Sequence, residues 1–73
     1  MAIEDILYDP GKNEVELVGY YGFSEYLSLD NFELVDANER ELGTEMEYVI
    51  EYQKDIIHLI LYPEGVLSDY WIA

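Results

Sequence analysis

The sequence predicts one domain, residues 1–73, that is α+β or mostly β, with a small antiparallel sheet of four to five strands and one short helix. Two observations lead to this fold class. Apolar and polar side chains alternate with a period of two in several short segments, and turn-forming residues separate those segments. The apolar content is 51%, which is far above that of chains too polar to collapse.

The first two segments predict a β-hairpin. A short strand over residues 3–8 ends at residues 9–13, where proline and glycine favour a tight turn. The next strand, residues 14–21, carries Glu14 and Glu16 in alternation with apolar residues. One face of this strand should therefore be buried and the other acidic.

Residues 22–35 allow two interpretations. Ser28 is a suitable N-cap for a short helix over residues 29–33, although the leucines on either side of it also alternate as in a strand. We expect about one helical turn there, followed by an extended segment at residues 32–35. Residues 36–40 have the composition of a turn.

The clearest pattern is a strand over residues 44–53. Its two faces carry different residue types: Met46, Tyr48, Ile50 and Tyr52 on one, and Glu45, Glu47, Val49 and Glu51 on the other. After a turn at residues 53–55, residues 56–62 are apolar on both faces, as in a central strand. We expect this hairpin to form the centre of the sheet. Residues 63–65 end its second strand, and residues 66–73 are too few to assign.

The net charge is −14, from 17 acidic residues and three cations. The cations, Lys12, Arg40 and Lys54, are all expected in turns, which leaves the strand faces acidic. This balance opposes binding to nucleic acid or to an anionic membrane through a basic patch. A charged partner should therefore be a basic protein, such as a nucleic-acid-binding protein.

Other site classes find little support. The chain has no Cys and one His, so we expect no disulfide, no metal site and no cofactor. The residues after Met1 are acidic rather than those of a signal peptide, and the apolar run around His58 is shorter than the roughly 20 residues of a membrane span. A cytoplasmic protein is the expectation, in the host cell if a phage encodes it.

An enzyme is not expected. The paired carboxylates are alike and solvent-facing, whereas acid–base catalysis needs two differently tuned carboxyl groups beside a cleft. His58 is the candidate for a tunable base, and we interpret it as packed in or beside the sheet and hydrogen-bonded there. No catalytic residues are proposed.

The spacing of the acidic residues matches that of DNA phosphates. Side chains two apart on a strand are separated by about 6.6 to 6.8 Å, and successive phosphates along a DNA strand by roughly 7 Å. A plainly solvated face is the alternative interpretation, but such faces usually mix the two signs of charge. The candidate partner-binding acids are Glu14, Glu16, Glu45, Glu47 and Glu51, with the first two expected on a strand neighbouring the other three.

Aromatic residues are the candidate anchors. Eight Tyr and one Trp exceed what so small a core needs, and both residue types contribute strongly to interfaces. The candidates are Tyr20, Tyr21, Tyr26 and Trp71. The apolar end, residues 70–72, also suggests a homodimer, which self-repulsion would oppose.

The segment Leu27-Ser28-Leu29-Asp30-Asn31-Phe32-Glu33-Leu34, preceded by Tyr20-Tyr21, resembles the small uracil-DNA glycosylase inhibitors of tailed phages. Members of that family are short, acidic, dimeric proteins of sheet and helix that occupy a DNA-binding groove as DNA mimics. The resemblance implies an apolar pocket near Leu29 and Phe32 that grips an apolar side chain of the enzyme.

These observations predict a small inhibitor that mimics nucleic acid and blocks a host enzyme of restriction, CRISPR defence or DNA repair. Carboxylates would bind the Arg and Lys residues that normally hold phosphates. One alternative is an immunity or antitoxin protein that neutralises a nuclease toxin. Another is a structural or subunit module without a charged partner.

Overall fold

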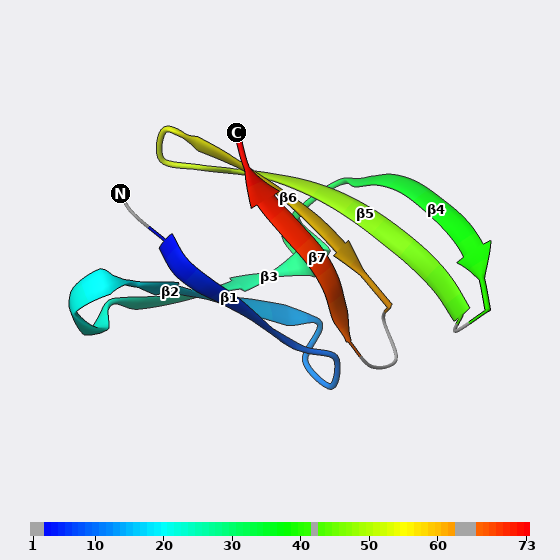
Figure 1. The fold of residues 1–73 in the computed structure, drawn as a ribbon, viewed down its shortest axis with the longest axis horizontal. Helices are drawn as coiled ribbons and strands as arrows, with labels where there is room; N and C mark the ends of the chain where they lie inside the picture. The colour runs from blue at the N-terminus through cyan, green and yellow to red at the C-terminus, as the bar shows by residue number, and fades with distance from the viewer. Residues whose placement is uncertain (1–2, 42, 63–65) are drawn as a thin grey trace.

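The computed structural model describes residues 3–41, 43–62 and 66–73. Seven strands make up most of this part of the chain and form two antiparallel sheets (Figure 1). Sheet A has the strand order β1-β2-β3, and sheet B has the order β4-β5-β6-β7. The strands are β1 Ile3–Asp9, β2 Glu14–Gly19, β3 Ser24–Ser28, β4 Leu34–Arg40, β5 Gly43–Tyr52, β6 Asp55–Leu61 and β7 Leu67–Ile72.

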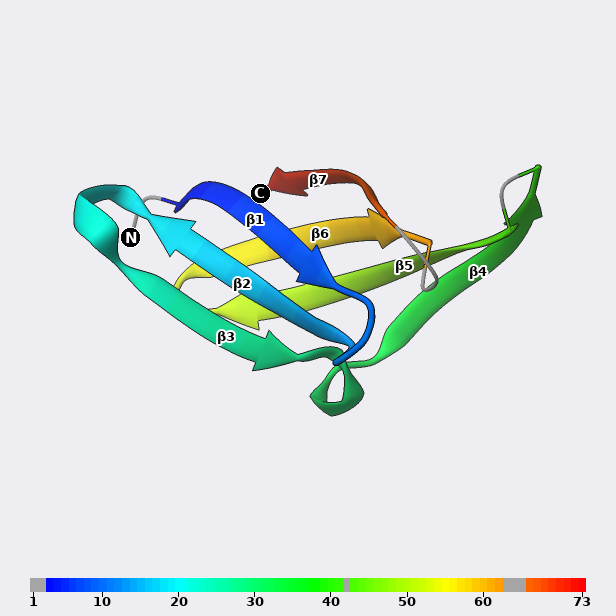
Figure 2. The same cartoon turned by 90° about the horizontal axis from the view of Figure 1, so that it is seen from below.

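The two sheets lie face to face and share one hydrophobic core (Figure 2). The inner faces supply the buried side chains, which are Ile6, Val15, Leu17, Leu29, Tyr48, Ile50, Ile57, Leu59 and Leu61. At one side of the molecule β1 and β7 run side by side without pairing (Figure 1). The outer face of each sheet is open to solvent.

Both predicted hairpins are confirmed. β1 pairs with β2, and β5 pairs with β6 at the centre of sheet B. Tyr48 and Ile50 are buried, as the alternation predicts, and Met46 and Tyr52 pack against the core. The antiparallel, mostly β character follows from this alternation, but the sequence underestimates the number of strands.

The expected short helix over residues 29–33 is not confirmed, because the structure has only a single 3-10 turn there, η2 at Leu29–Asn31. Ser28 does cap it, because its Oγ accepts the Asp30 N–H at 3.3 Å. A second 3-10 segment, η1 at Tyr20–Gly22, joins β2 to β3. No α-helix occurs in the described residues, and none of their helical segments is long and apolar enough to cross a membrane.

The predicted turn at residues 36–40 is wrong, because these residues belong to β4. Asp36 to Arg40 pair with β5, and the hairpin turns after Arg40. Their turn-like composition reflects an edge strand with every residue exposed. Arg40 consequently lies in a strand, whereas Lys12 and Lys54 lie in turns as predicted. The predicted end of β6 at residues 63–65 lies outside the described residues.

Three edge strands share one local structure. In β1, β4 and β7 the pairing register shifts by one residue, and an aspartate follows the shift. Its Oδ1 accepts the N–H of the next residue, at 2.8 Å for Asp5, 2.9 Å for Asp36 and 2.8 Å for Asp69. A bulge and a charge on an edge strand both oppose pairing with another strand. These edges are therefore protected.

Candidate partner-binding surfaces

The predicted acidic residues lie on two opposite faces of the molecule. Glu14 and Glu16 are on the outer face of sheet A, and the other three are on the outer face of sheet B. Because the sheets share one core, these faces point in opposite directions (Figure 2). The idea that the two sets sit on neighbouring strands is wrong. A single partner groove would therefore meet one set at a time.

The outer face of sheet B has an aromatic centre. Val49, His58 and Trp71 lie opposite one another on β5, β6 and β7. The rings of His58 and Trp71 are parallel within 6°, with centroids 4.8 Å apart. Trp71 remains 43% exposed, so one face of a stacked aromatic pair is available to a partner. His58 packs against Trp71 on the sheet, as predicted, but its side chain has no hydrogen bond within the described residues, contrary to the prediction.

Carboxylates border this aromatic centre. Glu47 and Glu51 lie on β5, one alternate position to either side of Val49. Glu47 is directly opposite Asp36 on β4, so two acidic residues are paired across the strands, and the Asp36 carboxylate accepts the Ala37 N–H and the Asn38 side-chain amide. In the described part of the chain, neither glutamate has an ion pair or a hydrogen bond. We call Glu47, Glu51, Ile56, His58, Ile60 and Trp71 the Trp71 surface.

Glu45 lies on the same strand face but is engaged within the protein. Its Oε1 is 3.8 Å from Arg40 Nε, and its Oε2 accepts the Tyr62 hydroxyl at 3.2 Å. Burial, together with this hydrogen bond, raises the pKa of Tyr62. Glu45 therefore differs from Glu47 and Glu51, although all three have the same spacing in the sequence.

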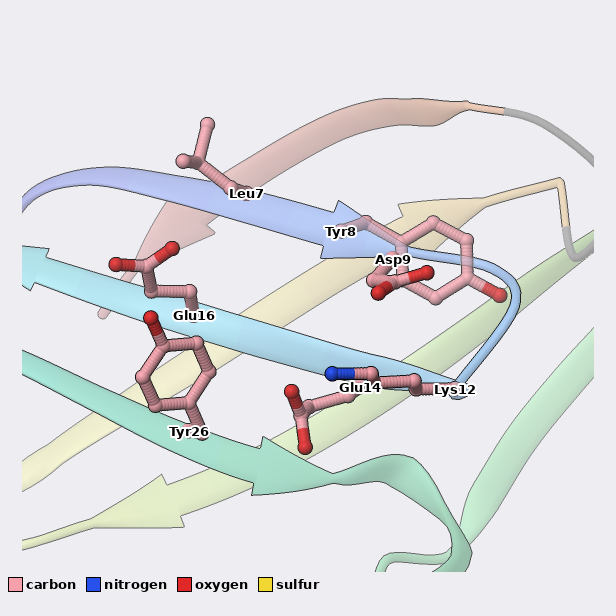
Figure 3. Close-up of a pocket in the computed structure, with 7 residues that line it drawn as sticks. All are labelled: Leu7, Tyr8, Asp9, Lys12, Glu14, Glu16 and Tyr26. Carbon is pink, nitrogen blue, oxygen red and sulfur yellow. The ribbon is translucent and has the colours of Figure 1, made fainter.

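The outer face of sheet A carries the second acidic set. Glu16 lies between Leu7 and Tyr26 on the neighbouring strands, and its Oε2 accepts the Ser24 hydroxyl at 2.8 Å. Glu16, Leu7 and Tyr26 border a hollow of about 140 Å³ (Figure 3). Its lining consists of Leu7, Tyr8, Asp9, Lys12, Glu14, Glu16 and Tyr26. Because Lys12 lines this hollow, the sheet A face contains a cation of its own.

The remaining predicted aromatic and apolar residues are dispersed. Tyr20 and Tyr21 are exposed in η1, and Tyr21 has a left-handed φ of 66°. Leu29 is 1% exposed and belongs to the core, against which Phe32 packs. Leu29 therefore does not line an open pocket for a partner. It lies where the chain reverses and fills space between the two sheets.

Sequence reasoning missed a set of tyrosine–carboxylate contacts. Tyr52 on β5 donates to Glu25 on β3, and Tyr70 on β7 donates to Asp5 on β1. Each contact joins sheet B to sheet A. The Glu25 bond raises the pKa of Tyr52, while burial, followed by the charge of Asp5, raises that of Tyr70. Part of the excess of Tyr and acid is thus structural, and periodicity alone contains no signal for such pairs.

Comparison with protein-family models, curated proteins and solved structures finds no match. Within residues 3–41, 43–62 and 66–73 no group of His, Asp and Glu side chains is arranged to hold a metal ion. The candidate sites therefore rest on the geometry of the two outer faces.

Proposed function

We propose that this protein binds the basic, nucleic-acid-binding surface of another protein and thereby excludes nucleic acid from it. The Trp71 surface makes the contact. The observation that carries this proposal is the pairing of unpartnered carboxylates, Glu47 and Glu51, with a half-exposed tryptophan on one sheet face. Sheet A supports the proposal less well because Lys12 lines the hollow beside Glu14 and Glu16, whereas the cation on the outer face of sheet B, Arg40, pairs with Glu45 outside the Trp71 surface.

The fold itself does not explain Glu47. Like charges directly opposite on neighbouring strands destabilise a sheet, and Asp36 faces Glu47 in this way. A polar neutral residue would keep the face soluble without that cost. A negative residue at this position is instead suited to a positively charged partner.

The chemistry of recognition follows from the arrangement. Glu47 and Glu51 are four residues apart on one strand, about 13 to 14 Å, which is close to two phosphate steps of roughly 7 Å. Each carboxylate can accept two hydrogen bonds from an arginine fork. Trp71 lies two strands away on β7, at the level midway between the two glutamates, and its exposed ring offers a cation–π and stacking contact to a guanidinium. Charge would thus provide attraction, and Trp71 a fixed position.

The test begins with a partner captured from a nuclease-treated lysate of cells that carry the gene. The purified partner is mixed with a labelled DNA or RNA, and displacement of the nucleic acid is measured against added protein. We expect displacement at stoichiometric amounts and weaker binding at higher salt. A partner that holds nucleic acid and this protein together would contradict the proposal.

Matched variants locate the contact. Replacing Glu47 and Glu51 with Gln should weaken the complex by about tenfold or more, because the loss of one member of a close charge pair across an interface has effects of this size. Trp71→Ala should weaken it by a similar factor. The control is Glu39→Gln with Glu41→Gln, which removes the same charge from the exposed β4–β5 hairpin. Equal effects of the two double variants would show attraction by net charge without a defined surface.

A further inference from the structure

The free edge of β3 differs from the other edges of the two sheets. β1, β4 and β7 each have a register shift and an aspartate that accepts an edge N–H. β3 pairs with β2 in continuous register and contains no aspartate. Among the described residues, no other group bonds to its outward backbone groups. The one charged residue of β3, Glu25, accepts the Tyr52 hydroxyl of sheet B. An edge in regular register without a bulge is a template for another strand.

The pairing of β2 with β3 determines which groups face this edge. The Gly19 N–H donates to the Phe23 carbonyl at 2.9 Å, and these two residues lie opposite each other. Because hydrogen-bonded pairs alternate along an antiparallel ladder, the odd-numbered residues of β3 bond to β2. The even-numbered residues, Ser24, Tyr26 and Ser28, therefore direct their N–H and C=O groups outward.

The same alternation accounts for the hydrogen bond between the Tyr70 N–H and the Asp69 carboxylate on β7. The Ala73 N–H donates to the Ile56 carbonyl at 2.8 Å, so alternation directs the Tyr70 N–H away from β6. The Asp69 carboxylate accepts that N–H. On β7 the alternation therefore correctly identifies an N–H that faces away from the neighbouring strand, because the Asp69 carboxylate accepts it.

We propose that β3 pairs with β3 of a second copy of this chain and joins two sheets A into one six-stranded sheet. The sequence of β3 is self-complementary about Tyr26. In an antiparallel pair centred there, Tyr26 faces its counterpart, Ser24 faces Ser28 and Glu25 faces Leu27. No carboxylate lies directly opposite another. Tyr26 is 60% exposed in the single chain, and the pair would cover it.

Charge repulsion between the copies is limited by distance. The two Glu16 residues would be three strand spacings apart, about 14 Å, which exceeds the Debye length of about 8 Å at physiological ionic strength. The two Glu25 residues would be diagonal neighbours at about 7 to 8 Å, and the carboxylate of each is held by Tyr52 of its own chain. Salt screens the repulsion that remains between two chains of net charge −14, so it should strengthen the dimer. It should weaken the proposed partner complex, which depends on attraction between opposite charges.

The test is analytical ultracentrifugation of the full chain from about 10 µM to about 1 mM, a range suited to weak interfaces, at about 50 mM and about 500 mM NaCl. We expect a monomer–dimer equilibrium with the larger dimer fraction at high salt. Amide resonances of residues 24–28 should shift with concentration in NMR spectra. A monomer under all conditions would overturn the proposal, and so would association that salt weakens.

Two matched pairs of variants identify the surface. Tyr26→Pro removes an outward N–H at a position where an edge strand tolerates proline, and Ala37→Pro does the same at the protected β4 edge. Tyr26→Glu adds a charge at the edge, and Leu7→Glu adds one elsewhere on the same sheet face. Both Tyr26 variants should weaken dimerisation at least tenfold, and both controls should retain it. A dimer that survives the Tyr26 variants, or concentration-dependent shifts confined to β4 or the Trp71 surface, would assign association to another surface and contradict the proposal.

The dimerisation test can fail or succeed independently of the test of nucleic-acid displacement. The Tyr26 variants leave Glu47, Glu51 and Trp71 unchanged on the opposite face. Loss of the dimer with intact displacement of nucleic acid would support both proposals. A monomeric wild-type protein that still displaces nucleic acid would remove the dimer alone.

Discussion

The hydroxyl of Tyr70 on β7 donates to Asp5 Oδ1 on β1 at 3.3 Å and joins the two sheets where their edges run side by side. The same oxygen accepts the N–H of Ile6 at 2.8 Å. One carboxylate thus satisfies an edge N–H and links the layers. In a chain with three cations among 73 residues, neutral donors take the place of lysine and arginine around this acid.

Removing the Asp5 carboxylate tests this link. Asp5→Ala should lower the free energy of unfolding by about 1 to 3 kcal/mol, because each of two hydrogen bonds is worth roughly 0.5 to 1.5 kcal/mol. Tyr70→Phe should cost less, because the Ile6 bond remains. Urea unfolding of both variants and the double variant measures the coupling. Full additivity would show that the hydroxyl and the carboxylate act independently.

Alkaline pH should destabilise the fold. The pKa values of Tyr8, Tyr52, Tyr62 and Tyr70 are raised above their ordinary 10.0, through burial, neighbouring charge and carboxylate hydrogen bonds. As pH rises above 10.0, the unfolded chain loses these protons first, so stability falls until the folded pKa values are passed. Below 10.0 the contribution is fully present. Urea midpoints between pH 8 and about 11.5 measure this, and constant midpoints would contradict it.

The Glu25 carboxylate should account for part of that shift. Its hydrogen bond is the largest cause of the raised pKa of Tyr52. Glu25→Gln removes the charge, so one tyrosine should ionise at lower pH in a tyrosinate absorbance titration. Tyr52→Phe serves as the control, because it deletes the same titration step. Identical curves for Glu25→Gln and the wild type would contradict the contact.

Leu29 should behave as a core residue. It is 1% exposed, and its N–H donates to the Asn13 carbonyl at 2.8 Å, which positions η2 against the β1–β2 turn. Leu29→Ala should lower the free energy of unfolding by about 2 to 5 kcal/mol through the cavity that it leaves. Denaturant unfolding measures the loss. A change below about 0.5 kcal/mol, typical of a surface position, would restore the partner-pocket interpretation.

The sequence predicts the strands that alternate in polarity or form a continuous apolar run, such as β5 and β6, and misses strands that are exposed or short. Alternation in residues 44–52 places Tyr48 and Ile50 inside. β4 is exposed on both faces, so its composition resembles that of a turn. β3 is short and follows a 3-10 segment, so its period is interrupted. Edge strands obtain their structure from pairing with a neighbour, which local periodicity does not encode.

The candidate site is predictable only in part, for a similar reason. Spacing places Glu45, Glu47 and Glu51 on one face, which the register confirms. It cannot distinguish Glu45, held by Arg40 and Tyr62, from Glu47, which faces Asp36. Those neighbours come from other strands. Cross-strand register therefore separates a structural carboxylate from one that is free to bind.

This separation can be measured on one strand. Glu45→Gln and Glu47→Gln make the same change two residues apart and relieve the same overall repulsion. Glu47→Gln should raise the free energy of unfolding by about 0.2 to 1 kcal/mol by removing the like-charge pair with Asp36. Glu45→Gln should leave it unchanged or lower it, because the Arg40 ion pair is lost. In urea unfolding at low salt, the account predicts that Glu47→Gln is the more stable variant, and a Glu45→Gln variant of equal or greater stability would contradict it.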